Sequence, residues 1–385
     1  MLGLGSSIAK PGKIGKRIVR DGLVLKHDYN AGAVEPCSTG AASFTASAND
    51  YITAGTNTSL NPADGSFSIS CWVNSNLAST ASAATGFIVG KGDSTNTGVG
   101  SGTGFALYLG DSGTDWVFWV SDGSDRALSQ TSTPANANQW YHLCGTFDTS
   151  GTDTAKLYVD GVLIASNTQA LNTAAVDNDF TIGRLASSAT SDWDGYICNV
   201  GFWKGVVLTQ PQVKSIMLKN YAALSASEKT GLSSWWNLDS VIDSVGASTA
   251  VYDNHYAGGS KLGTELVTDG SFANGLDSWT SANVTLSGSS VILYDDDADY
   301  VFQSISYTDG EVYAFTFEGT GNVQSRIGYT GAAATQIPLT LPATIYRLVD
   351  SDASRVQVYG ASDDSPATLT SVSVKLVNGN TGTLS

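Results

Sequence analysis

Hydrophobic and polar residues alternate along most of the chain in short runs with a period of two. In residues 67–73 (FSISCWV) the odd-numbered positions are apolar and share one face, which is the pattern of a half-buried β-strand. Residues 116–120 (WVFWV) are almost continuously apolar, as is typical of a central strand. Asp160 and Gly161 separate two apolar runs and predict a hairpin, because both central residues of a type I′ turn need positive φ. Further strands are predicted at 139–147, 156–160, 179–184 and 195–203.

One helix interrupts these strands. Thr209 and Gln212 have the spacing of a capping box, so we expect a helix that begins there and continues through 213–218 with its apolar residues on one side. Ser225 and Glu228 repeat the same spacing and predict a second, shorter helix.

The strand pattern stops and then restarts in the second half of the chain. Residues 252–262 are rich in Gly and polar side chains and are interpreted as a linker. Beyond them Tyr313, Phe315 and Phe317 share one face, and Gly-Thr-Gly-Asn at 319–322 predicts a turn after them. Strands with no helices between them indicate a second sandwich. They are predicted at 345–349, 356–359 and 372–376.

These patterns predict an all-β protein with two antiparallel β-sandwich (jelly-roll) domains preceded by an extended N-terminal arm. Only 14% of the 385 residues are charged and 42% are hydrophobic, which is the composition of a folding chain. The expected boundaries are 1–45 for the arm, 46–250 for the first sandwich, 251–264 for the linker and 265–385 for the second sandwich.

Charge is distributed unevenly over a chain whose formal net charge is -16. Up to Lys26 there are six basic residues and one acidic residue, a charge of +5, which leaves -21 for the remainder. A basic arm on an acidic body suggests docking onto an acidic partner such as a neighbouring copy, with a solvated tail as the alternative. The body lacks the clustered Lys and Arg that nucleic-acid binding needs. The arm residues expected to dock are Lys10, Lys13, Lys16, Arg17 and Arg20.

The cysteines indicate a reducing environment. Their spacing matches no zinc site and no CxxC motif, and most lie in apolar strand-like runs, so we expect buried free thiols, with a cross-strand disulfide as the alternative. They are Cys37, Cys71, Cys144 and Cys198. The first 19 residues contain no apolar stretch of signal-peptide length, and no run approaches the roughly 18 to 20 apolar residues that span a bilayer. We therefore expect no membrane insertion and synthesis without a signal peptide.

Four segments of the first body resemble the laminin-G-type, concanavalin A-like jelly rolls. They occur in the order of that family between residues 48 and 238. The segments are 66–73 (SFSISCWV), 139–147 (QWYHLCGTF), 156–163 (KLYVDGVL) and 195–203 (GYICNVGFW). Cys198 departs from the pattern, because the family usually has an acidic residue there, so a function that needs that carboxylate is not implied.

The second body is similar to carbohydrate-binding-module jelly rolls of the galactose-binding-like type. Residues 265–280 (ELVTDGSFANGLDSWT) resemble the opening of that family, and 369–376 would be its closing strand. The family's closing strand commonly carries an Asp pair that holds a structural calcium, but Thr370 and Ser371 stand in those places.

Together the arm and the two bodies resemble structural proteins of marine tailed phages. This resemblance implies a virion protein that is made in the host cytoplasm, with other virion proteins as partners and a homo-oligomer such as a trimer. It implies a capsid decoration, a head fibre or a tail component. The alternative is a receptor-binding adhesin or tail fibre that recognises host surface polysaccharide.

Candidate binding residues lie in the second body. Its tyrosines are better candidates for an exposed platform on which sugars stack than the tryptophans of the first body, which lie in strand patterns. The tyrosines are Tyr294, Tyr300, Tyr307 and Tyr329. The acidic run at 295–299 includes Asp295 and Asp297, whose oxygens suit calcium, although a solvated turn is the alternative because the run lacks the spacing of a calcium loop.

Catalytic motifs are missing from the sequence. None of the five glutamates lies in the paired-carboxylate strand motif of related glucanases, so a glycoside hydrolase is a distant alternative. Residues 110–113 (GDSG) contain a serine but are interpreted as a hairpin loop, and His142 lies in a predicted strand where a structural role is expected. We therefore expect a non-enzymatic protein without a resident cofactor.

Overall fold

The structure is a computed structural model in which the arm is described only in small part. The residues described are 27–28, 33–34, 36, 38, 40–62, 65–76, 86–93, 102–110, 115–131, 135–172, 176–186, 192–239, 250–251, 253, 262–294, 298–327, 336–349, 353–361, 366–379 and 382–384. Contacts divide the chain into two compact units, which are residues 1–240 with Ser385 (unit 1) and residues 241–384 (unit 2).

In the residues of unit 1 that the structure describes, short strands are accompanied by one α-helix, α2. Its strands are β1 (His27–Asp28), β2 (Ala33–Val34), β3 (Ala42–Phe44), β4 (Ile52–Thr53), β5 (Phe67–Ser75), β6 (Gly86–Gly92), β7 (Thr103–Leu109), β8 (Trp116–Asp122), β9 (Arg126–Gln130), β10 (Trp140–Asp148), β11 (Thr154–Val159), β12 (Val162–Thr168), β13 (Phe180–Ile182), β14 (Gly195–Lys204) and β15 (Leu232–Trp236). The helices are η1 (Ala46–Ala48), η2 (Thr58–Leu60), α2 (Gln210–Ile216) and η3 (Tyr221–Ala223).

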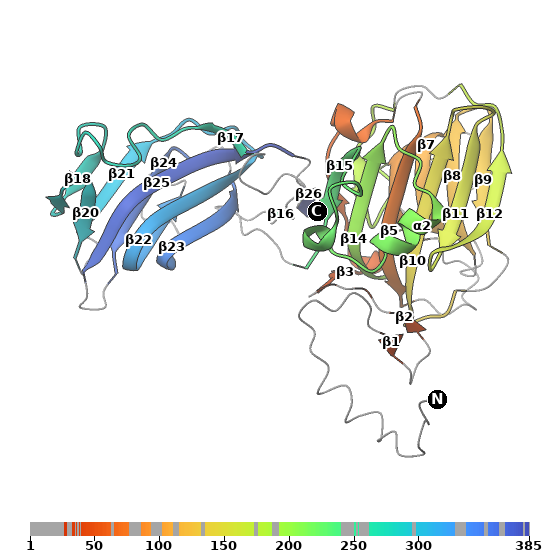
Figure 1. Ribbon diagram of the computed structural model, residues 1–385, viewed down its shortest axis with the longest axis horizontal. Helices are drawn as coiled ribbons and strands as arrows, with labels where there is room; N and C mark the ends of the chain where they lie inside the picture. Colours follow the sequence, from red (N-terminus) through yellow and green to blue (C-terminus); the bar gives the residue numbers. More distant parts are fainter. Residues whose placement is uncertain are drawn as a thin grey trace, which may run out of the picture. The chain divides into compact units, whose positions relative to one another are not determined.

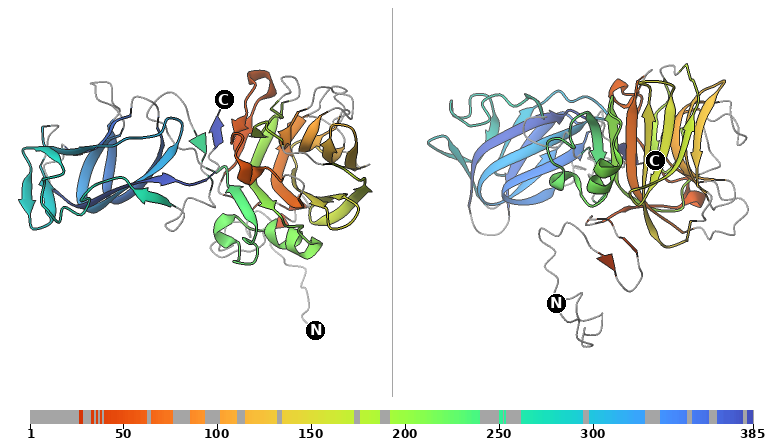
Figure 2. Two further views of the ribbon diagram at one scale, coloured as in Figure 1. Left: turned by 90° about the horizontal axis from the view of Figure 1, so that it is seen from above. Right: turned by 45° about the vertical axis from the view of Figure 1, so that its right-hand side comes forward.

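Two antiparallel layers form the sandwich of unit 1 (Figures 1 and 2). One layer has the order β12–β11–β10–β5–β14–β15, with β3 beside β14, and the other contains β4–β13–β6–β7–β8–β9. Aromatic rings from both layers meet between them, because the ring of Phe67 on β5 lies 4.6 Å from that of Phe105 on β7. The Asp160–Gly161 hairpin is confirmed, with φ of 48° and 73° at its two central residues.

The boundaries of unit 1 differ from those expected. Strand β3 lies within the predicted arm but pairs with β14, so the sandwich begins before residue 46. Strand β16 (Ala250–Val251) lies on the predicted boundary between the first sandwich and the linker, and it pairs with β26 (Gly382–Leu384). Sequence periodicity missed both strands because they are only two or three residues long.

Helix α2 covers the outer side of the layer that contains β5 (Figure 1). The backbone N–H of Thr209 donates to Oε1 of Gln212 at 2.9 Å, as the predicted capping box requires. The indole N–H of Trp72 on β5 donates to the carbonyl of Met217 at 2.8 Å. A second apolar cluster thus forms outside the sandwich. Its buried members are Cys144, Tyr158, Trp203, Leu208, Val213, Ile216, Leu224, Leu232 and Trp235.

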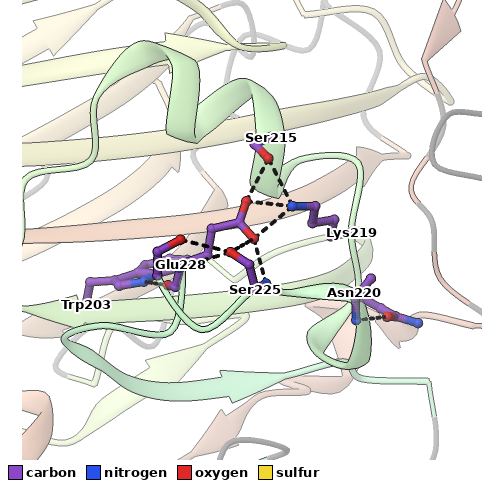
Figure 3. A network of polar contacts seen from close by, with 8 residues as sticks. Trp203, Ser215, Lys219, Asn220, Ser225 and Glu228 are labelled. Carbon is purple, nitrogen blue, oxygen red and sulfur yellow. Dashed lines mark hydrogen bonds and ion pairs between the residues drawn. The ribbon is translucent and has the colours of Figure 1, made fainter.

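A buried polar network fixes this cover in place (Figure 3). The carboxylate of Glu228 accepts hydrogen bonds from Ser215 Oγ at 2.6 Å, from Lys219 Nζ at 2.7 Å and from the backbone N–H of Ser225 at 2.8 Å. Its carbonyl accepts from the indole N–H of Trp203 at 2.8 Å. Burial alone would raise the pKa of Glu228, but these hydrogen bonds outweigh it and lower the pKa to about 2.

The short helix expected after Ser225 is wrong. Residues 226–231 form turns, although Ser225 and Glu228 make the hydrogen bond of a capping pair. The carboxylate also binds Lys219 and Ser215 on the α2 side. Glu228 therefore acts as a link between segments rather than as the start of a helix.

Unit 2 is an antiparallel sandwich with long strands (Figure 1). Its strands, besides β16 and β26, are β17 (Leu262–Glu265), β18 (Thr280–Ala282), β19 (Thr285–Ser287), β20 (Ser290–Leu293), β21 (Tyr300–Ser304), β22 (Val312–Ile327), β23 (Ile337–Leu348), β24 (Arg355–Gly360) and β25 (Ala367–Val377). The order is β18–β21–β24–β22–β25–β20–β19, with β17 beside β25 and β23 beside β22. The two units thus confirm the all-β, antiparallel sandwich prediction.

Strand β22 joins the two layers of unit 2. Its first part pairs with β25 and its last part with β24, while β23 accompanies both. The predicted turn at 319–322 is wrong, because the chain continues through it as a bulge inside the strand. Gly319 has φ of 146°, and a Cβ there would lie 2.0 Å from the carbonyl oxygen of Thr368, so only glycine fits.

The core of unit 2 lies between these layers. The predicted face of Tyr313, Phe315 and Phe317 points into it, together with Phe272 and Trp279 of the opening segment. Glu265 ties β17 to the closing strand β25, since its carboxylate accepts from the N–H of Val374 at 2.8 Å and from the hydroxyl of Ser373. The opening and closing segments therefore meet, as the resemblance of the second body implies.

Candidate functional site

One broad side of unit 2 gathers aromatic rings and arginines on neighbouring strands. Tyr300 and Phe302 come from β21, Tyr359 and Arg355 from β24, and Arg326 from β22. Tyr300 is paired with Tyr359 across the strands, and alternate residues of one strand point to the same side. These five residues therefore share one surface, which we call the arginine–aromatic face. The strands that carry it lie side by side (Figure 1).

Local sequence explains why these side chains point outward. Val301 on β21 and Val356 and Val358 on β24 are fully buried in the core. Because strand residues alternate between the two sides of a sheet, the neighbours of these valines point away from the core. Burial of these valines in the core therefore determines which side chains form the arginine–aromatic face.

The two guanidinium groups lie over rings. The central carbon of Arg326 is 4.4 Å from the ring centroid of Tyr359, and one of its Nη atoms donates to the Tyr359 hydroxyl at 3.0 Å. The central carbon of Arg355 is 4.6 Å from the ring centroid of Phe302. The ring of Tyr300 lies between the two aromatic supports, 5.7 Å from Tyr359 and 6.0 Å from Phe302. Cation–π contacts of this kind hold a guanidinium in a defined orientation.

A shallow cavity adjoins the face at β22 and β23. Its volume is about 230 Å³, which is below the roughly 300–1,000 Å³ of common ligand pockets. Gln324 lines it and stands opposite Tyr359 on the neighbouring strand, so the cavity and the face are continuous. The side-chain oxygen of Gln324 is buried and accepts no hydrogen bond from the described residues. This oxygen is therefore enclosed beside the cavity rather than displayed at its surface. Its lining is Asn322, Val323, Gln324, Pro338, Leu339, Thr340 and Ala361.

The four tyrosines expected to form a glycan platform do not lie together. Tyr300 is on the arginine–aromatic face, whereas Tyr294 is exposed after β20 and its hydroxyl donates to Thr285. Tyr307 is wrong as a platform residue: its hydroxyl is buried, its ring packs on Tyr313, and burial raises its pKa. Tyr329 lies outside the described residues.

The other predicted site residues also lie outside the described part. Asp295 and Asp297 lie outside it, so calcium binding by the acidic run at 295–299 stays a prediction. Among the residues that the structure does describe, no three His, Cys, Asp or Glu side chains are grouped to hold a metal ion. The docking residues of the arm are undescribed as well, and these are Lys10, Lys13, Lys16, Arg17 and Arg20.

A serine and a histidine come together in unit 1 without forming a reachable site. Nε2 of His142 lies 2.8 Å from the hydroxyl of Ser70, but both side chains are buried beneath the cover that α2 provides. Asp160 bonds to the backbone N–H of His142 and not to its ring. Burial lowers the pKa of His142 to about 3, so the ring is neutral near pH 7. The structural role expected for His142 fits this position.

Three of the cysteines are buried free thiols, as expected. Cys71, Cys144 and Cys198 are fully enclosed and unpaired with one another, and burial raises the pKa of each thiol. Cys37 lies outside the described residues. A raised pKa suppresses the reactive thiolate, so these residues pack as small apolar side chains.

The geometry of unit 1 agrees with a family comparison. Residues 46–214 match the concanavalin A-like lectin/glucanases superfamily. The match begins after β3 and ends inside α2, and it confirms the resemblance drawn from the four motifs of the first body. No curated protein matches the chain.

Solved structures with a similar fold cover parts of the chain. A Bacteroides ovatus protein described as carbohydrate-binding is 22% identical, with a TM-score of 0.41 over 56% of this chain and 55% of its own. A SAP-like pentraxin from Limulus polyphemus is 16% identical, with a TM-score of 0.32 over 44% and 75%. Tailspike protein 4 of bacteriophage CBA120 is 17% identical, with a TM-score of 0.22 over 29% and 21%. The chain thus spans about half of the first of these proteins.

Sequence reasoning missed most of the arginine–aromatic face. It selected Tyr300 but not Phe302, Tyr359, Arg326 or Arg355. A signal was present, because YVFQS and RVQVY place valines between aromatic and basic residues. Because the valines point into the core, the large rings that alternate with them must point to the outer side of the sheet.

No helix in the described part of the chain is long and apolar enough to cross a membrane.

Proposed function

We propose that this protein is a non-enzymatic structural protein of a tailed-phage virion that also binds glycan through the arginine–aromatic face of unit 2. The observation that carries the glycan-binding part is the face itself, with two arginines held over rings beside a shallow cavity. The virion part is supported by the order of a basic arm and two jelly rolls along the sequence. Its location as capsid decoration, head fibre or tail component belongs to the same proposal.

The face has the chemical groups that sugars require. The half-buried ring of Tyr300 offers an apolar surface for the C–H side of a pyranose. The amide of Gln324 and the guanidiniums of Arg326 and Arg355 provide donors around that ring. The adjoining cavity of about 230 Å³ suits one small sugar unit better than a large ligand.

Unit 1 supports a scaffold rather than an enzyme in this proposal. Its Ser70–His142 pair is enclosed and so out of reach of a substrate. The acidic residue that the family usually carries is replaced by Cys198, which is buried. Unit 1 would then serve assembly, together with the basic arm and a homo-oligomer such as a trimer.

Binding of sugars by the full chain on a glycan array tests the first part. Tyr300→Ala should weaken binding about tenfold, because it removes the ring between the two supports. Tyr294→Ala is the matched control, since this exposed tyrosine lies off the face and should leave binding unchanged. Equal losses in both variants, or no binding by the parent chain, would contradict the proposal.

Particle incorporation tests the second part. Deleting residues 1–26 removes the six basic residues and leaves β3 in the sandwich. The shortened chain should fold, bind sugar as before and fail to enter particles. Replacing Lys10, Lys13, Lys16, Arg17 and Arg20 by Gln should reproduce the loss if charge is the cause. Unchanged incorporation would favour the alternative, a receptor-binding adhesin that does not depend on the arm.

A further inference from the structure

Strand β12 forms one end of its layer in unit 1, and its side chains are unusually open to solvent. The layer begins β12–β11–β10, so among the described strands β12 pairs with β11 alone (Figure 1). Six of its seven residues are exposed, and they include Val162, Leu163 and Ile164 at 49%, 41% and 47%. Half of the large apolar side chains exposed in the described part of the chain therefore lie on this one strand.

The edge of β12 lacks the features with which proteins usually block strand pairing. Such edges commonly carry a charged residue or a proline, whereas residues 162–168 (VLIASNT) contain neither. The pairing with β11 has one bulge, at Leu157 and Tyr158, and the extra residue on β12 is Ile164. An edge with unpaired backbone groups and apolar side chains is a template for another strand.

We infer that β12 pairs in antiparallel orientation with β12 of a second copy of this chain. Two copies of the same edge are related by a two-fold axis, which gives a dimer with one sheet that continues through both copies. An axis centred on Ala165 pairs all seven residues of one strand with all seven of the other. This inference goes beyond the proposed function, because it holds whether or not the chain belongs to a virion.

The charges beside the two ends of β12 complement each other in this arrangement. At the hairpin end, a Cβ on Gly161 would lie 2.7 Å from Cγ of Lys214, so this lysine lies next to position 161. At the other end, the carbonyl of Asp153 accepts from the backbone N–H of Gln169 at 2.9 Å. With the axis at Ala165, position 161 of one copy lies opposite position 169 of the other. Lys214 of each copy is thereby brought toward Asp153 of the other, which favours a second copy as the partner.

The net charge of the chain limits which surfaces of two copies can meet. Each copy has a formal net charge of -16, so two copies repel one another except where the local charge is neutral or complementary. The uncharged strand β12, with opposite charges beside its two ends, meets that condition. A single pair of strands is small beside interfaces of roughly 1,200–2,000 Å², so the dimer should dissociate at about micromolar concentrations.

Sedimentation velocity of the full chain over a range of micromolar concentrations tests this inference. We expect an equilibrium between monomer and dimer. Leu163→Lys places a charge on the paired edge and should weaken the dimer at least about tenfold. Leu286→Lys is the matched control, because Leu286 on β19 is 43% exposed and should leave the equilibrium unchanged. Both positions are exposed, so thermal unfolding should show that both variants remain folded.

An exchange of charges tests the orientation of the two strands. Lys214→Glu should weaken the dimer about two- to fivefold, because exposed ion pairs contribute little. Combining it with Asp153→Lys should recover most of that loss, and no recovery would overturn the register centred on Ala165.

A chain that stays monomeric, or a dimer that Leu163→Lys leaves intact, would overturn the inference. A trimer would overturn it too, because the pairing of like edges has two-fold symmetry, but it would leave the proposed homo-oligomer standing.

Discussion

The two units treat the outer side of a strand layer in opposite ways. In unit 1 the outer side of the β5 layer carries Trp203 and Cys144, and the segment around α2 covers both completely. In unit 2 the outer side of the β21–β24–β22 layer carries Tyr300 and Phe302, which stay half-buried beside arginines. Both outer sides are rich in rings, and among the described residues a covering segment is seen only over the layer of unit 1.

The difference shows that similar strand layers can carry either a covered apolar cluster or a surface of rings and guanidiniums. Each large apolar side chain taken out of water contributes about 1.5–3 kcal/mol, so the second cluster of unit 1 stabilises that unit. The rings of unit 2 are less completely buried, so they contribute less of this stabilisation, and they contact guanidinium groups instead. The cover in unit 1 depends on Glu228, and the surface in unit 2 depends on Arg326 and Arg355.

Removing the anchor of the cover should have the largest effect. Glu228→Ala breaks a buried ion pair and leaves Lys219 without its partner, which should destabilise unit 1 by about 3–5 kcal/mol. Denaturant unfolding followed by tryptophan fluorescence measures this, because eight of the nine tryptophans lie in unit 1. Glu318→Gln, at an exposed position of β22, is the control and should cost less than about 0.5 kcal/mol.

Acid should weaken unit 1 in two stages. The unfolded chain binds a proton on His142 near pH 6.5 and the folded chain only near 3, so stability is present above 6.5 and falls as the pH falls, by about 3 kcal/mol at pH 4.5. The Glu228 carboxylate, with a folded pKa of about 2, adds a further loss below about pH 4.5. In the His142→Gln variant, the free energy of unfolding measured from pH 7 to 4.5 should no longer show the first of these two losses. A slope unchanged from the parent chain would contradict this assignment.

The smallest effect on binding is expected when the hydroxyl is removed from the ring that supports Arg326. Tyr359→Phe keeps the ring but removes the hydroxyl that accepts from Arg326, which should cost about 1 kcal/mol of the glycan binding proposed for this face. Calorimetry at one salt concentration measures it, with unit 2 remaining folded because the core is untouched. A loss as large as that of Arg326→Gln would mean that the hydroxyl itself contacts the sugar.

Sequence periodicity predicted the strands well where alternation was strong, as in 67–73, and the capping box located α2 at Thr209 and Gln212. It failed where tertiary contacts decide the outcome. Gly319 looked like a turn but permits a close approach to Thr368 inside a strand. Tyr307 and Tyr300 look alike in sequence, yet only the packing of unit 2 places one inside and the other on the surface.

The arginine–aromatic face was only partly visible for the same reason. Tyr300 could be selected as an aromatic residue in the second body, but its partners come from strands that are distant in sequence. Arg326 reaches Tyr359 only because the bulge redirects β22 toward β24. Pairing of that kind depends on register, which a single sequence does not specify.

The continuity of β22 has a mechanical consequence. A ligand held on the face pulls on β22 and β24, and β22 extends for 16 residues into the ladder with β25. Force along the strand is therefore shared by many hydrogen bonds loaded side by side, whereas a strand that ended at Gly319 would pass the load to a loop. In the proposed virion protein, this single strand would connect the ligand-binding face to the rest of unit 2.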